Sequence, residues 1–230
     1  MDTVRPEFIG RLDQVQLFED LLLYEGDQRW ILNVYGGGGI GKTALLRYYQ
    51  RLCDQHGAPH GPLIDFYELA YHSPRRVMRD IARALSGQNP DCFVPFLEAT
   101  DSEPGTPMVG IGEKYLQEAV RLFKASLSQF AQDNLTTHKI KTVLFFDTCE
   151  QAPLSLRNWL VEDLLCDIPH VVAVVAGRDR LTVPPGREDE FHACVLDAFA
   201  LNEAKSFFAS IRLPHALDER QVADLWSLAR

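Results

Sequence analysis

The stretch that most constrains this chain is residues 35–43, which read Y-G-G-G-G-I-G-K-T. It satisfies the pattern G-x-x-x-x-G-K-[ST], in which glycines let several backbone N–H groups point at one anion. The lysine of such a loop places a positive charge beside phosphates, and the hydroxyl after it is suited to Mg²⁺. The sequence therefore predicts a phosphate-binding loop. Its candidate ligand-binding residues are Gly36, Gly37, Gly38, Gly39, Ile40, Gly41, Lys42, Thr43 and Ala44.

The segments on either side of this loop support the prediction. Residues 30–35 (W-I-L-N-V-Y) form a short apolar run of the kind found in buried parallel strands. After the loop, Leu45, Tyr49 and Leu52 recur at helical spacing. Strand, glycine loop and helix is the order that a phosphate-binding loop requires. The alternative, a glycine-rich turn followed by Lys-Thr by chance, does not account for these neighbours.

Four further runs have the composition of strands, and they cover residues 63–67, 142–147, 171–176 and 192–196. The second of them, T-V-L-F-F-D, ends in Asp147. Ligands bind at the carboxyl ends of the strands in open α/β sheets. We therefore predict that Asp147 and Thr43 hold Mg²⁺ together. The alternative is that Asp147 merely caps a turn at the end of its strand.

Two more charged residues follow predicted strands. Glu150 comes three residues after Asp147 and could orient the attacking water, act as a base or simply begin a helix. Arg178 follows the run V-V-A-V-V-A and could reach a γ-phosphate or be an exposed loop arginine. We take Lys42, Asp147, Glu150 and Arg178 as the candidate catalytic residues.

The rest of the chain is predicted to be helical or loop. A first helix carries Leu17, Phe18, Leu21 and Leu22, with Asp13 and Gln16 as its capping pair. Further helices are predicted from Ser73-Pro74 onward, over 113–132 and over 154–165, and 86–112 reads as a long loop because it is rich in Gly, Pro, Asn and Asp. Two helical segments follow residue 200, the second of which starts at Asp218 paired with Gln221.

Composition restricts the class of protein. The 230 residues suffice for one α/β domain and a small appendage, and the net charge of −9 does not favour nucleic acid as a partner. The five cysteines contain no C-x-x-C pair, which indicates free thiols in a reducing compartment. No apolar run approaches the length of a membrane span. We expect a soluble, cytoplasmic protein without a membrane partner. The guanine-reading pattern N-K-x-D is absent from the sequence, as are G-x-S-x-G and H-E-x-x-H.

Four motifs, in this order and at these distances, resemble the STAND class of P-loop NTPases, which includes the NACHT and AP-ATPase families. They are F-I-G-R, G-G-G-G-I-G-K-T-A-L, L-F-F-D-T-C-E and V-V-A-G-R-D, and the resemblance spans residues 8–230. It implies a five-stranded parallel sheet of order 5-1-4-3-2 over residues 1–200, flanked by helices. Residues 201–230 would begin a small helical domain, and we expect the protein to continue, because no stop signal follows Arg230. The resemblance also places Phe8, Ile9, Gly10 and Arg11 against adenine and phosphates, and makes Arg178 the sensor of ATP against ADP.

The resemblance implies a Mg²⁺-dependent ATP/ADP switch for signal transduction. ADP would hold a closed monomer, and exchange for ATP would release an oligomer, with downstream domains of the chain and self-association as the partners. Many members carry a second acid directly after the strand-ending Asp, whereas this chain has Thr148. Either Glu150 substitutes for that acid or ATP hydrolysis is slow. The alternative function is an AAA+-like remodelling ATPase or a small-molecule kinase with steady turnover.

Overall fold

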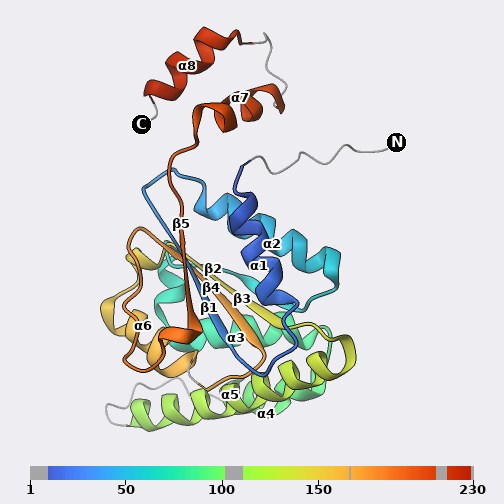
Figure 1. Cartoon of the computed structure of the whole chain (residues 1–230). Coiled ribbons are helices and arrows are strands. Elements are labelled where there is room, and N and C mark those ends of the chain that lie inside the picture. The colour runs from blue at the N-terminus through green and yellow to red at the C-terminus, as the bar shows by residue number, and fades with distance from the viewer. Residues whose placement is uncertain (1–9, 102–110, 166, 211–216, 229–230) are drawn as a thin grey trace.

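The computed structural model describes residues 10–101, 111–165, 167–210 and 217–228, and its centre is one parallel sheet. The strands are β1 (Trp30–Tyr35), β2 (His60–Asp65), β3 (Thr142–Asp147), β4 (Val171–Gly177) and β5 (Phe191–Val195). They lie in the order β2-β3-β4-β1-β5, with every neighbouring pair parallel (Figure 1). Read from the other edge, this is the predicted order 5-1-4-3-2, so the fold prediction is confirmed.

Both faces of the sheet are covered by helices. Every residue of β3 and β4 is buried, as expected for central strands rich in Val, Leu and Phe. Successive residues of a strand point to opposite faces, so Leu32 and Phe145 pack on α1 (Leu12–Leu22) and α2 (Lys42–His56). Leu144 and Phe146 face the other layer, formed by α3 (Pro74–Ser86), α4 (Val94–Asp101), α5 (Ile111–His138) and α6 (Leu154–Asn158). Figure 1 shows the two layers on either side of the strands.

The start of α1 differs from the prediction. The helix begins at Leu12, after Arg11 in the left-handed region (φ 65°), and has no side-chain cap. Gln16 donates to Asp20 one turn later instead of pairing with Asp13. The predicted capping pair is therefore wrong, because the helix begins two residues earlier than a cap at Asp13 allows.

The segment predicted as a loop over 86–112 contains helical structure. A short 3₁₀ turn (Pro90–Phe93) leads directly into α4. Phe93 and Phe96 are fully buried, and both rings pack against Phe123 of α5. The burial of these aromatic side chains outweighs the loop propensity of the surrounding Gly, Pro and Asn. Residues 102–110 of this segment lie outside the described residues.

Other boundaries shift by a few residues. The predicted strands 63–67 and 192–196 are observed as β2 and β5, displaced toward the N-terminus, and the predicted helix 113–132 is the longer α5. The predicted helix 154–165 consists of α6 and a π-helical turn, Trp159–Leu164. After β5 the chain forms α7 (Leu201–Ser210) and α8 (Glu219–Leu228), beyond the carboxyl ends of the strands (Figure 1). The predicted cap of α8 is confirmed, because Asp218 and Gln221 each accept the other's backbone N–H, at 2.8 and 2.9 Å.

The cysteines and helices of the described part of the chain show two further properties. Cys53, Cys92, Cys149 and Cys194 are free thiols. Within the described residues, every helix is too short or too polar to cross a lipid bilayer.

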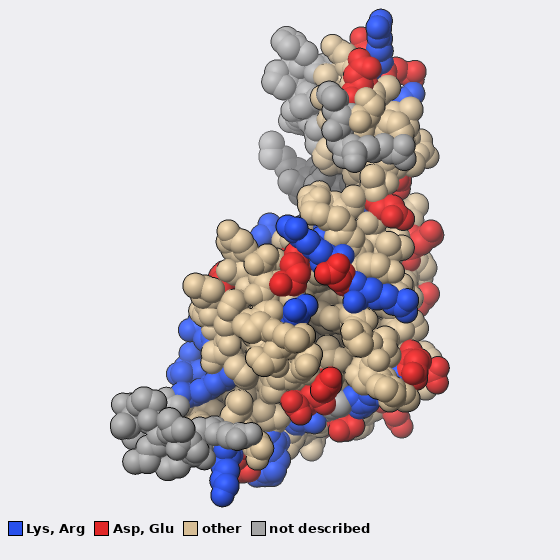
Figure 2. All heavy atoms as spheres, turned by 90° about the vertical axis from the view of Figure 1, so that its left-hand side faces the viewer, with Lys and Arg blue, Asp and Glu red and all other residues tan. Residues whose placement is uncertain are grey.

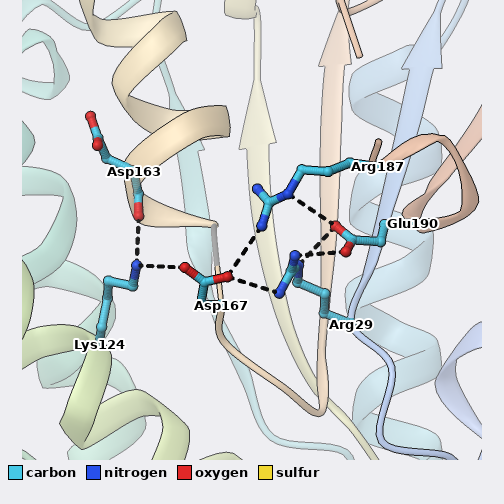
Figure 3. Close-up of polar contacts among 6 residues, drawn as sticks. All are labelled: Arg29, Lys124, Asp163, Asp167, Arg187 and Glu190. Atoms are coloured by element: carbon cyan, nitrogen blue, oxygen red, sulfur yellow. Dashed lines mark hydrogen bonds and ion pairs between the residues drawn. The ribbon is translucent and has the colours of Figure 1, made fainter. Parts of the chain in front are cut away.

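Ion pairs connect the amino-terminal ends of three strands, at the edge opposite the glycine loop (Figure 3). Arg29, just before β1, donates two hydrogen bonds to Glu190, just before β5, at 3.0 and 2.7 Å. Asp167, ahead of β4, lies 3.7 Å from Arg29 and 3.3 Å from Arg187. Asp167 is 75% exposed, so its pairs contribute little, whereas the two-pronged Arg29–Glu190 pair is largely shielded. At this end of the sheet the Arg29–Glu190 pair is thus the main ionic link between β1 and β5, and it is remote from the predicted site.

Lys141 gives the fold a testable pH dependence. It is fully buried just before β3, and its Nζ donates to the backbone oxygens of Gly26 and Gln28 at 2.7 and 2.6 Å. Burial lowers the pKa of Lys141 to about 8. Between this pKa and the ordinary value of 10.5, the unfolded chain binds more protons than the folded one. Stability should therefore rise with pH across this window.

Urea unfolding of the wild type and of Lys141→Met at pH 7.5 and 9.5 checks this expectation. The wild type should gain stability relative to the variant by about 1–2 kcal/mol over this interval, since one pKa unit corresponds to about 1.4 kcal/mol. Because the other lysines and tyrosines titrate in both proteins, the difference isolates Lys141. An equal response of the two proteins to pH would contradict the assignment.

Candidate functional site

The glycine loop joins the end of β1 to the start of α2. Gly36 has φ 155° and Gly41 has φ 98°, backbone conformations that residues with a Cβ rarely adopt. A Cβ on Gly36 would lie 2.4 Å from the backbone oxygen of Leu196, so only glycine fits at this position. On Gly37 or Gly39 a Cβ would meet nothing within 4 Å. The space on the side of these two residues where a Cβ would lie is therefore open.

Lys42 covers this loop at the first position of α2. Its Nζ donates to the backbone oxygens of Gly36 and Gly37, both at 2.8 Å. Gly41 precedes the helix without a side-chain cap, and the first turn of α2 contains no acidic residue. The N–H groups of an uncapped helix start and a nearby ammonium both favour an anion at this position.

Thr43 and Asp147 are 104 residues apart in sequence and in direct contact. The Thr43 hydroxyl donates to Asp147 Oδ2 at 2.6 Å, and the Thr148 N–H donates to Asp147 Oδ1 at 2.8 Å. Asp147 is only 2% exposed, and burial raises its pKa, with these two hydrogen bonds acting in the opposite direction. The structure thus brings together the two side chains that the sequence predicts as Mg²⁺ ligands.

Sequence reasoning missed a second carboxylate at this edge. Asp65 ends β2 and is in register with Asp147 on the neighbouring strand. Its charge raises the pKa of Asp147, although burial contributes more. The signal was present in the sequence, because the run L-I-D ends in an acid just as T-V-L-F-F-D does. It was overlooked because the strand was predicted to continue to residue 67.

Glu150 and Arg178 are paired to each other beside the loop. Arg178 Nε and its backbone N–H donate to the two carboxylate oxygens of Glu150, each at 3.2 Å. Both residues line a cavity of about 500 Å³ between α6 and the segment after β4. Figure 2 shows charged side chains of both signs around a hollow on the face formed by these elements. The sequence predicts both residues as catalytic, but it does not predict the contact between them.

Arg11 lies on the opposite side of the loop. Its Nη2 donates to the backbone oxygen of Asp197 at 2.6 Å and to that of Ile40 at 3.4 Å, and its guanidinium lies 4.8 Å from the Phe199 ring centroid. A pocket of about 240 Å³ here is lined by Arg11, Gly39, Ile40, Ala198, Phe199, Ala204, Phe207, Phe208, Leu225 and Trp226. Gly10 adjoins Phe199 and Glu203. Phe8 and Ile9 lie outside the described residues.

The donors at this edge suit a phosphate-bound Mg²⁺. Within the described part of the chain, no group of three or more His, Cys, Asp or Glu side chains is placed to hold a metal alone. Mg²⁺ usually takes one or two protein oxygens and completes its shell with water and substrate phosphates. Thr43 and Asp147 offer oxygens of that kind, and a Cβ on the nearby Gly37 or Gly39 would meet no other atom within 4 Å.

Comparisons with known proteins agree with this architecture. The sequence matches no family model, and no curated protein matches it. The structure resembles that of Cdc6p from Pyrobaculum aerophilum, with a TM-score of 0.52 and 14% identity over 91% of this chain and 51% of that one. It also resembles Drosophila ORC bound to DNA, with a TM-score of 0.56 and 13% identity over 89% and 47% of the two chains.

The chain has the fold of a P-loop NTPase. At identities of 13–14%, these likenesses concern the fold alone. The chain spans about half the length of the two solved chains that it matches. The class of P-loop NTPase to which the chain belongs is therefore inferred from the residues of the site.

Proposed function

We propose that this chain binds ATP and ADP together with Mg²⁺ at the carboxyl edge of its sheet. The observation that carries the proposal is the 2.6 Å contact between Thr43 and Asp147, at the start of the helix that follows the glycine loop. Lys42, now bound to Gly36 and Gly37 oxygens, would turn to the phosphates. Bound Mg²⁺ would offset the charge of the phosphates, and Thr43 and Asp147 are the residues that would hold it.

The pocket between Arg11 and α8 is our candidate for the base. Phe199, Phe207 and Trp226 provide aromatic surface beside Ile40 of the loop, which suits a flat ring. The sequence contains no N-K-x-D for reading guanine. We therefore propose adenine as the preferred base, in agreement with the role that the resemblance gives to residues 8–11.

Equilibrium dialysis with labelled nucleotides tests this proposal. We expect ADP to bind in the presence of Mg²⁺, to bind more weakly in excess EDTA, and to be favoured over GDP by at least about tenfold. Equal binding of ADP and GDP would remove the base assignment. No binding of either nucleotide, with the protein folded, would remove the proposed function.

Within this function we propose that the chain is a nucleotide-dependent switch and not an ATPase that hydrolyses ATP rapidly. The resemblance to the STAND class supports it, as does Thr148 in place of a second acid beside Asp147. Arg178 would detect the γ-phosphate, and the difference between ATP and ADP would change how the chain associates with itself and with further domains. We expect this to occur in the cytoplasm.

An AAA+-like remodelling ATPase is the second candidate, and the likeness to Cdc6p and ORC supports it. Since that ORC structure is of a DNA complex, DNA is a possible partner under this candidate, although the net charge of −9 opposes it. The two candidates differ in turnover and in the nucleotide retained. A switch should copurify with ADP and hydrolyse ATP slowly, whereas a remodeller should be isolated largely empty and hydrolyse ATP steadily.

Analysis of the nucleotide released by acid from freshly purified protein separates the two. We expect ADP at close to one equivalent, and a monomer that self-associates only when ADP is exchanged for a non-hydrolysable ATP analogue. Steady ATP hydrolysis with no retained nucleotide would favour the remodeller.

A further inference from the structure

The contact between Glu150 and Arg178 uses a particular part of the arginine. Glu150 accepts from the backbone N–H and from Nε, and neither hydrogen bond involves a terminal amino group of the guanidinium. Arg178 Nη2 lies 3.9 Å from the position that a Cβ would occupy on Gly38, which belongs to the glycine loop. The guanidinium therefore spans from Glu150 on one side to the phosphate-binding loop on the other.

The local backbone fixes Glu150 in this position. Thr148 adopts the left-handed conformation (φ 56°), and its N–H is held by Asp147. This turn leads into the short 3₁₀ helix Cys149–Gln151 and carries Glu150 from the end of β3 to the end of β4. A Cβ on Gly177 would lie 3.5 Å from Glu150 Oε2, so the carboxylate packs closely on the β4 backbone. Glu150 is 19% exposed, whereas Arg178 is 63% exposed.

The less exposed member of a pair is the one that can orient the other. An exposed arginine has many rotamers, and holding it in one of them before the ligand arrives reduces the loss of entropy on binding. A carboxylate that holds Nε leaves the end of the guanidinium, with one N–H of each terminal amino group, free of that contact. That end of the guanidinium can bind two phosphate oxygens at once.

We propose that Glu150 is a positioning residue for Arg178: it holds the guanidinium by Nε so that the terminal amino groups face a γ-phosphate in the glycine loop. This inference rests on the proposed function, because it assumes that the loop binds nucleotide. It assigns Glu150 a role in distinguishing ATP from ADP, in contrast to that of a general base for hydrolysis. ADP has no γ-phosphate, so the affinity for ADP should not depend on the Glu150–Arg178 pair.

The test compares affinities for ADP and for a non-hydrolysable ATP analogue in Glu150→Gln, Arg178→Ala and the double variant. Glu150→Gln should weaken binding of the analogue about two- to fivefold, the range for a partly exposed ion pair, with ADP affinity unchanged. Arg178→Ala should weaken the analogue at least as much. The double variant should be no weaker than Arg178→Ala, because the glutamate acts only through the arginine. Glu162→Gln is the matched control, since Glu162 lines the same cavity and forms no described ion pair with Arg178.

Hydrolysis distinguishes positioning from base catalysis. A positioning role predicts that Glu150→Gln raises KM for ATP and lowers kcat by less than tenfold. Loss of a general base would lower kcat by about 10²–10⁴ at an unchanged affinity ratio. That result, or additive effects in the double variant, would overturn the inference while nucleotide binding stands. Absence of binding in the wild type would instead refute the proposed function itself.

Discussion

Replacing Asp147 with Asn is expected to abolish most Mg²⁺-dependent nucleotide binding without destabilising the empty protein. Asp147 is almost fully buried, and burial raises its pKa, which means that the folded state disfavours its charge. The neutral amide removes this penalty and can still accept from the Thr148 N–H and contact the Thr43 hydroxyl. Affinity for Mg²⁺-ADP should fall by at least about 10–100-fold, the range seen when partners in a metal site are lost.

Urea unfolding measures the effect on stability, and calorimetric titration of Mg²⁺-ADP measures the effect on binding. Urea unfolding without nucleotide should give Asp147→Asn a free energy of unfolding equal to or above that of the wild type. Between pH 3.8 and the raised pKa of Asp147, the folded wild type binds more protons than the unfolded chain. Raising the pH through this window should therefore lower wild-type stability relative to the variant. A variant that is less stable than wild type at neutral pH, or that binds Mg²⁺-ADP equally well, would contradict this account of Asp147.

Gly36→Ala is expected to lower the free energy of unfolding by about 2–4 kcal/mol. It should also weaken nucleotide binding. The new Cβ would lie 2.4 Å from the Leu196 backbone oxygen. At the same point the Leu196 N–H donates to Tyr35 at 2.8 Å, which continues the β1–β5 ladder into the loop. Relief of the clash must move either the loop or the exit of β5, and both adjoin the proposed phosphate site.

Gly37→Ala is the matched control for this change. A Cβ at Gly37 would meet nothing within 4 Å, and stability should change by less than about 1 kcal/mol. Chemical denaturation of both variants, with calorimetric titration of ADP, measures the two effects. Equal stability of Gly36→Ala and Gly37→Ala would show that the tight approach at Leu196 is not required.

Local sequence signals are sufficient to predict the central strands and the edge of the sheet at which the ligand would bind. The short length of β3 and β4 and their content of β-branched and aromatic residues favour buried strands over helices, and parallel strands place Asp147 and the glycine loop at one edge. The strand order, however, was known from the family resemblance and not from any local pattern. It depends on contacts such as Asn33 of β1 with Val175 of β4, which are distant in sequence.

The elements that were missed depend on tertiary packing. Phe93 and Phe96 form helical structure because they are buried against α5, whereas their sequence neighbours signal a loop. Asp65 was missed through an error of two residues at the end of β2. The Glu150–Arg178 pair depends on the left-handed turn at Thr148, a conformation that is uncommon for a β-branched residue.

The central claim is that the loop, Lys42, Thr43 and Asp147 form a site for Mg²⁺-bound adenine nucleotide. Calorimetric titration of ADP with Mg²⁺ into wild type, Lys42→Ala and the control Lys114→Ala, which removes an exposed lysine on α5, tests it most directly. We predict wild-type binding in Lys114→Ala and a loss of at least about tenfold in Lys42→Ala, since charge-assisted contacts to phosphate are worth about 1.5–3 kcal/mol. Unchanged ADP affinity in Lys42→Ala would contradict the account.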